Sequence, residues 1–155
     1  MGMVSIWGKA GQVMLDLIYD RTEEDVRRGR DKGFYRHTDL NRVQDAAEAV
    51  RARFGAAGYD GIPAPSPAFT VWRENDIPTF SRAAGILRAV RAFAGLVPLA
   101  DAPGLADEVP SSPDLLDWRG ANAVEAFLYL LDDSLGRIEA AWIECGEGFS
   151  GEAEG

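Results

Sequence analysis

Three stretches of this sequence carry apolar residues at the three- and four-residue spacing of a helix face, and proline-rich segments separate them. The stretches begin at Thr38, Thr79 and Asp117, which are residue types that commonly cap helices. Proline removes a backbone donor and clashes inside a helix, so residues 58–71 and 98–113 are predicted connectors. We therefore expect a mainly α fold, a small helical bundle in which the three stripes form one core.

The three apolar stripes define the expected core. They comprise Leu40, Val43, Ala46, Ala47, Val50 and Phe54, then Phe80, Ala84, Leu87, Val90, Ala94 and Val97, and finally Val124, Phe127, Leu128, Leu131, Leu135, Ile138 and Trp142. Gly58 and Gly146 are expected to end the first and third helices, because glycine readily adopts the left-handed conformation of a helix C-terminus. A shorter helix is expected from Thr22 to about Arg30, closed by Gly33.

The two ends of the chain differ in composition from its helical part. Residues 1–20 have β-type composition, with alternation over residues 13–17, which predicts an N-terminal β hairpin or an extended arm. Residues 21–146 form the predicted helical domain. Residues 147–155 are short and polar, and we expect a flexible acidic tail that is frayed or taken up by a neighbour.

Charge is distributed unevenly along the chain, whose formal net charge is −9. Residues 101–155 carry thirteen acids against only Arg119 and Arg137, a local charge of −11. Such a segment repels phosphate backbones, so we expect no nucleic-acid partner. The acidic surface either aids solubility or docks on a basic partner. No apolar run approaches the roughly 20 residues of a membrane helix, so we expect no membrane insertion.

Few residues could carry catalysis. His37 is the single histidine and Cys145 the single cysteine, which excludes the His-rich and Cys-rich metal centres. The glycines do not form a phosphate-binding loop, and a nucleophile elbow is also missing from the sequence. Adjacent Asp132 and Asp133 do not face each other on a helix, so a solvated surface is the favoured interpretation. We expect no enzymatic activity, no cofactor and no metal.

The four tryptophans are the most conspicuous candidates for contacts. Trp142 is expected in the core because it lies on the third stripe. Tryptophans in a helical domain usually pack the core or anchor an interface, although an indole face can also stack on a sugar ring. The candidate interface residues, which include two from the tail, are Trp7, Trp72, Trp118, Phe149 and Glu152.

Several local motifs follow one another in a recognisable order. They are YDRTEEDV at 19–26, GFY and TDLNRV within 33–43, WRENDIPT at 72–79, AAW at 140–142 and FSGE at 149–152. This order resembles small uncharacterised proteins from the tail regions of Firmicutes phages and prophages, over most of residues 18–152. The first seventeen residues and the pair Cys145-Gly146 depart from that pattern.

The resemblance implies a structural component of a bacteriophage tail or baseplate that acts through protein–protein contacts and has no catalytic residues. Its partners would be other virion tail or baseplate subunits, with a possible homo-oligomer within the particle. The expected location is the virion tail, after synthesis in the host cytoplasm. Two alternatives stay open, namely a host-surface glycan-binding module of the tail and a small cytoplasmic phage-encoded regulator.

The charge distribution adds an expectation about assembly. We expect the chain's own helices to cover the inner stripe of the last helix. The acidic outer face and residues 147–155 are then expected to meet a different, more basic subunit, because like-charged copies repel one another.

Overall fold

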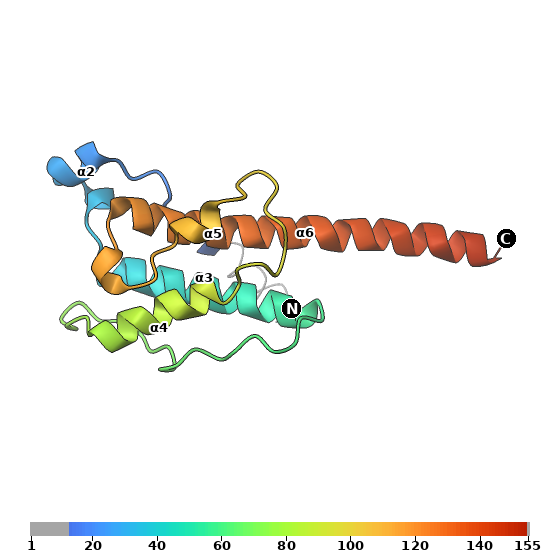
Figure 1. Cartoon of the computed structure of the whole chain (residues 1–155), viewed down its shortest axis with the longest axis horizontal. Coiled ribbons are helices and arrows are strands. Elements are labelled where there is room, and N and C mark those ends of the chain that lie inside the picture. Colours follow the sequence, from blue (N-terminus) through green and yellow to red (C-terminus); the bar gives the residue numbers. More distant parts are fainter. Residues whose placement is uncertain (1–12, 155) are drawn as a thin grey trace.

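The protein, described by a computed structural model, is defined for the backbone of residues 13–154 and for the side chains of residues 13–142 (Figure 1). Its elements are α2 (Glu23–Arg27), η1 (Asp31–Gly33), α3 (His37–Ala56), α4 (Phe80–Arg91), α5 (Leu105–Glu108), η2 (Pro113–Leu115) and α6 (Trp118–Glu154), where η marks a 3₁₀ helix. Residues 13–154 contain helices and connectors without a strand, which confirms the mainly α expectation.

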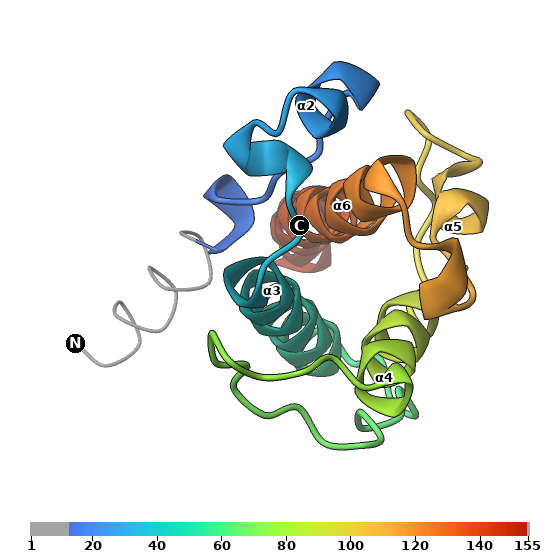
Figure 2. The ribbon, with the colours of Figure 1, turned by 90° about the vertical axis from the view of Figure 1, so that its left-hand side faces the viewer.

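Helices α3 and α4 and the first part of α6 surround one apolar core (Figure 2). Helix α2 lies beside the start of α6, and α5 packs on another side of the same helix. The fully buried large side chains of the core include Phe54, Val43 and Val50 from α3, Val90 and Phe93 from the α4 region, and Phe127, Leu128, Leu131 and Leu135 from α6. Residues from all three predicted stripes therefore meet in one core.

Side-chain caps begin three of the helices where the sequence predicts them. Thr22, Thr79 and Asp117 each accept a hydrogen bond from the backbone N–H three residues later, at 3.1, 3.3 and 2.8 Å. The Asp25 carboxylate in turn accepts the backbone N–H of Thr22 at 2.9 Å, which completes a capping box. These three predicted helix starts are confirmed.

The predicted cap at Thr38 is wrong by two residues. Helix α3 already includes His37, so Thr38 lies inside its first turn. The Asp39 carboxylate instead accepts the backbone N–H of Arg36 at 2.7 Å. A carboxylate in the first turn satisfies a free backbone donor and complements the positive end of the helix. Asp39 therefore has the capping role that was predicted for Thr38.

The C-terminus of α3 ends as expected at Gly58. Gly58 has a φ of +94°, a conformation that glycine adopts without steric cost. The backbone N–H of the next residue, Tyr59, donates to the carbonyl oxygen of Phe54 at 2.9 Å, and the two rings meet edge to face at 5.0 Å. This pattern is a Schellman motif with its usual apolar contact.

The segments before α3 differ from the prediction. Residues 13–15 are helical, and Met14 and Leu17 are buried in the core, so a strand over residues 13–17 is wrong. Over so few residues, the apolar spacing of one helical turn looks the same as the alternation of a strand. Residues 1–12, the remainder of the predicted arm, lie outside the described residues. Helix α2 ends at Arg27, earlier than the predicted Arg30.

The second stripe also needs correction at both of its ends. Phe80 is exposed, and α4 ends at Arg91, so Ala94 follows the helix and is exposed, whereas Val97 is buried as predicted. Phe93, which the stripe omits, is buried and stacks on Phe54 with ring centroids 5.7 Å apart. The chain turns after α4, so the helical spacing omits the buried Phe93 and includes the exposed Ala94.

Helix α6 does not end at Gly146. Its backbone stays helical through Glu154, and its C-terminal part extends beyond the other elements (Figure 1). Glycine lowers helix propensity by about 1 kcal/mol relative to alanine, which does not by itself end a helix. The helical backbone thus includes most of the predicted tail, residues 147–155.

Candidate functional site

Four charged side chains from distant parts of the sequence meet inside the protein. Glu125 of α6 is fully buried and accepts hydrogen bonds from Arg21 (Nη2 to Oε2, 2.7 Å) and Arg42 (Nε to Oε1, 2.6 Å). Arg42 also donates to Asp39 at 2.6 Å. Two arginines thus face two carboxylates, and the formal charges of this ionic cluster balance.

The ionic cluster is closed by further hydrogen bonds. Glu125 Oε1 also accepts the backbone N–H of Ile18 at 3.0 Å, while Asn122 exchanges hydrogen bonds with the backbone of Arg21 at 3.0 and 2.9 Å. Burial alone would lower the pKa of Arg42, but its hydrogen bonds to Glu125 and Asp39 outweigh burial and raise the pKa above its ordinary value. Both oxygens of Glu125 are occupied, so the cluster fastens the segment before α2 to α3 and α6.

Trp72, a predicted interface residue, is an internal anchor. Its side chain is 2 % exposed, and its indole N–H donates to the side chain of Gln44 at 2.8 Å. Asn41 exchanges two hydrogen bonds of 2.8 Å with the Trp72 backbone. The Arg82 guanidinium lies 3.7 Å from the ring centroid. Trp72 therefore fastens the connector to α3 and α4 and offers no free surface to a partner.

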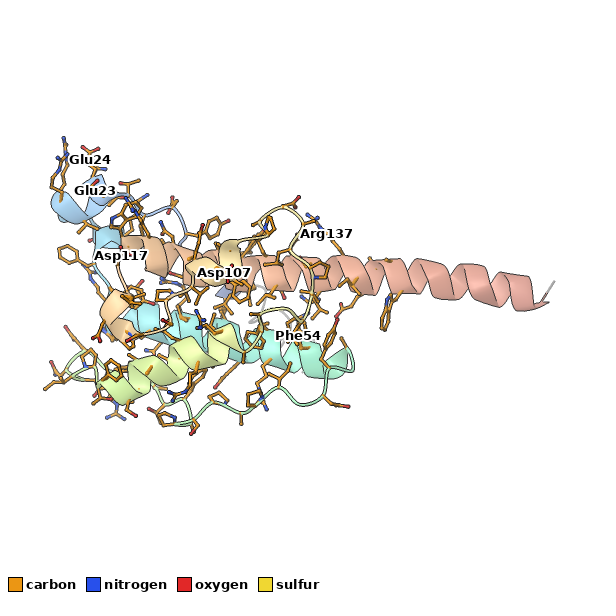
Figure 3. The ribbon with its side chains drawn as sticks, viewed as in Figure 1. Glu23, Glu24, Phe54, Asp107, Asp117 and Arg137 are labelled. Atoms are coloured by element: carbon orange, nitrogen blue, oxygen red, sulfur yellow. The ribbon has the colours of Figure 1, made fainter. Side chains whose placement is uncertain are left out.

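Trp118, the next predicted interface residue, lines an open groove of about 910 Å³ between α5, the connector after it and the start of α6. The Trp118 ring is half-buried, and the Arg119 guanidinium lies 5.1 Å from its centroid. The groove also contains Tyr19 and the exposed carboxylates Asp107 and Asp117, which are labelled in Figure 3. An aromatic ring beside polar groups suits a contact with a polar, flat surface.

Of the residues considered for catalysis, His37 lies in different surroundings from Asp132 and Asp133, and the side chain of Cys145 lies outside the described residues. His37 borders a groove of about 530 Å³ together with Tyr35 and Asp76. Asp132 contacts Arg53, whereas its neighbour Asp133 contacts Arg137 at 3.0 Å, so the two carboxylates have separate partners. Within the described residues, no group of three or more histidines, cysteines and carboxylates is placed to hold a metal ion.

Trp142 is 67 % exposed, so its predicted place in the core is wrong. It follows Val124 by 18 residues, which is five helical turns, and therefore lies on the same line of α6. Val124 and Leu135 are buried and Ile138 is half-buried, so the stripe becomes exposed towards its C-terminal end. Figure 1 shows that the C-terminal part of α6 extends beyond the other helices, which agrees with the exposure of Trp142.

The last ion pairs described between α6 and the rest of the chain mark where that coverage ends. Arg53 of α3 contacts Glu139 at 2.9 Å, and Asp101 contacts Arg137 at 3.7 Å. Beyond them, residues 140–142 are all exposed. Residues 140–154 add about 22 Å of helix at 1.5 Å per residue. We call residues 138–154 the α6 extension.

Three of the predicted interface residues cannot be placed. Phe149 and Glu152 belong to the α6 extension, but their side chains lie outside the described part of the structure. Trp7 also lies outside the described residues. Of the five candidates, Trp118 alone has a described side chain at the surface, and the exposed Trp142 was missed because its spacing is that of a core residue.

No family model, curated protein or solved structure matches this chain. Among the described residues, no helix combines the length and the apolar character needed to cross a membrane. The geometry of the chain itself is therefore the basis for a proposal about its function.

Proposed function

We propose that this protein is a structural subunit that acts through protein–protein contacts, with the α6 extension as its contact element. The observation that carries the proposal is the large exposed indole of Trp142 on the same line of α6 that forms the core. Buried aromatic residues dominate the binding energy of many interfaces. A helix that projects an apolar line beyond its own domain is well suited to insert that line into a partner.

The setting that we propose for this subunit, a bacteriophage tail or baseplate, rests on the resemblance of its motif order between residues 18 and 152 to tail-region proteins of phages. Such an assembly needs small rigid bodies that join neighbours through projecting elements. Here α3, α4 and the first part of α6 supply the body, and the α6 extension supplies the projection.

Quantitative mass spectrometry of purified phage particles tests this proposal. We expect the intact chain in a fixed ratio to other tail proteins, and we expect its loss from particles when residues 140–155 are deleted. The body should stay folded in that variant, because the last described contacts of α6 involve residues 137–139. Circular dichroism of the purified variant checks this point.

Two outcomes would contradict the proposal. An intact chain that is missing from particles but present in infected cells would favour a cytoplasmic regulator. A variant without residues 140–155 that still enters particles at the normal ratio would show that another surface makes the contact. Phe80→Ala is the matched control, because it removes an exposed aromatic side chain from α4 and should leave incorporation unchanged.

A second candidate function, glycan binding, is favoured by the groove beside Trp118. An indole face can stack on a sugar ring, and the carboxylates and arginines that line this groove are able to hydrogen-bond sugar hydroxyl groups. A glycan array probed with the intact chain and with Trp118→Ala tests it. Binding that disappears in Trp118→Ala and persists in Trp142→Ala would support this candidate, and absence of binding by the intact chain would reject it.

A further inference from the structure

We infer that the α6 extension pairs lengthwise with a basic amphipathic helix of a partner protein. This inference rests on the proposed function and names the chemistry of the partner. It depends on three properties of the α6 extension, which are its apolar line, its charge and its composition.

The apolar line continues directly from the core. Leu131, Leu135, Ile138 and Trp142 follow one another at spacings of four, three and four residues. In the sequence, Cys145 and Phe149 continue the same alternation. Spacings of three and four that repeat every seven residues are typical of helices that pair along their length. An α-helical partner therefore fits this line better than a loop or a strand.

The charge of the extension selects the partner. After Arg137 the sequence contains five glutamates and no lysine or arginine, so residues 138–155 carry a charge of −5. A second copy of the extension would bring the same charge to the contact, and like charges along paired helices repel. Lysine or arginine beside the seam of a partner helix would instead pair with these glutamates.

The composition of the extension also favours an external partner. Gly146, Gly148 and Gly151 all have low helix propensity. Isolated helices of about 15 residues are marginal in water even with good helix formers. A partner helix along the apolar line would supply the packing that the body of the protein gives to the first part of α6.

Two synthetic peptides of about four heptads test the inference, both with leucine at the seam positions and one with lysine, the other with glutamate, at the flanking positions. Their affinity for the intact protein is measured by fluorescence anisotropy of the labelled peptide. We expect the lysine peptide to bind at least about tenfold more tightly than the glutamate peptide. We also expect its affinity to fall at least about fivefold between roughly 50 and 500 mM NaCl, because salt screens the glutamates.

Matched variants show which part of the protein binds. Trp142→Ala should lower the affinity of the protein for the lysine peptide at least about tenfold, whereas Phe80→Ala on α4 should leave that affinity unchanged. Replacing Glu144 and Glu147 by glutamine removes two of the five negative charges and should reduce the salt dependence. The same replacement at Glu23 and Glu24 of α2 is the control for lost acidic charge elsewhere and should leave that dependence in place.

Other results would overturn the inference. Equal affinity for the two peptides, or salt-independent binding of the lysine peptide, would contradict the inference that the partner is basic. A tight homodimer in sedimentation that dissociates in Trp142→Ala but not in high salt would show that a second copy of this chain covers the apolar line. Tighter peptide binding after deletion of residues 1–12 would show that this segment occupies the line. None of these results decides whether the variant without residues 140–155 is lost from phage particles. The proposed function is therefore tested separately, by that incorporation experiment.

Discussion

The two parts of α6 carry the same apolar line in opposite surroundings. From Val124 to Leu135 the line is buried by α3 and α4 and contributes the centre of the core. At Trp142, on the same side of the same helix, the line is exposed. The difference lies in the neighbours and not in the helix, because the other elements end before the helix does (Figure 1).

This contrast shows what an amphipathic pattern can and cannot establish. The spacing of apolar residues tells which face of a helix needs to be covered. It does not tell whether the cover comes from the same chain or from another molecule. In α6 the first part is covered internally, and the extension is the part for which we propose a partner.

The largest expected difference between the two parts concerns their glutamates. Glu125→Gln leaves the buried Arg21 and the half-buried Arg42 with one carboxylate between them, and breaking a buried ionic cluster in this way costs about 3–5 kcal/mol. Glu139→Gln removes one half-exposed partner of Arg53 and should cost less than about 1 kcal/mol. Urea unfolding followed by circular dichroism measures both. Equal losses of unfolding free energy in the two variants would show that the stability contributed by Glu125 does not depend on its burial.

The next difference concerns the apolar line itself. Leu131→Ala should lower the free energy of unfolding by about 2–5 kcal/mol, because Leu131 is 1 % exposed and its truncation leaves a cavity in the core. Urea titration with an unchanged slope would identify this as a loss of stability without a change in the unfolded state. A loss below about 0.5 kcal/mol would remove Leu131 from the core.

Local sequence signals predicted the helix starts that depend on a single side chain. Thr22, Thr79 and Asp117 are followed directly by helical sequence, and each caps its helix as predicted. The start at Thr38 failed because the acidic residue after it can satisfy the same backbone donors from inside the first turn. Such alternatives differ by one hydrogen bond, so residue type alone does not separate them.

Features that depend on distant contacts could not be predicted. The ionic cluster joins Arg21, Asp39, Arg42 and Glu125, which are up to 104 residues apart in the sequence. Nothing in the sequence distinguishes any one of them from an ordinary charged residue at the surface. Trp72 lies in a connector, and its burial depends on Asn41 and Gln44 of α3. Its role as an anchor becomes visible only when the connector has been placed against that helix.

The two ends of α6 should also respond differently to changes in helix stability. Asp117→Ala removes the cap at the packed start and should cost about 1 kcal/mol in global unfolding. Gly146→Ala improves helix propensity beyond Glu139, where no described contact couples the helix to the core, so global stability should stay within about 0.3 kcal/mol. Far-ultraviolet circular dichroism and urea unfolding separate the two effects. A stabilisation of about 1 kcal/mol by Gly146→Ala would show that the extension unfolds together with the body.

The last expected effect is that of Trp142→Ala on the stability of the isolated protein. Trp142 has the position of a core residue by spacing, and a buried tryptophan replaced by alanine typically costs about 3–5 kcal/mol. Because 67 % of its side chain is exposed, we expect a change within about 0.5 kcal/mol in urea unfolding. Trp72→Ala is the matched control, since that indole is buried and hydrogen-bonded. A cost above about 2 kcal/mol for Trp142→Ala would mean that the isolated chain already covers its own extension, and the contrast between the two parts of α6 would then disappear.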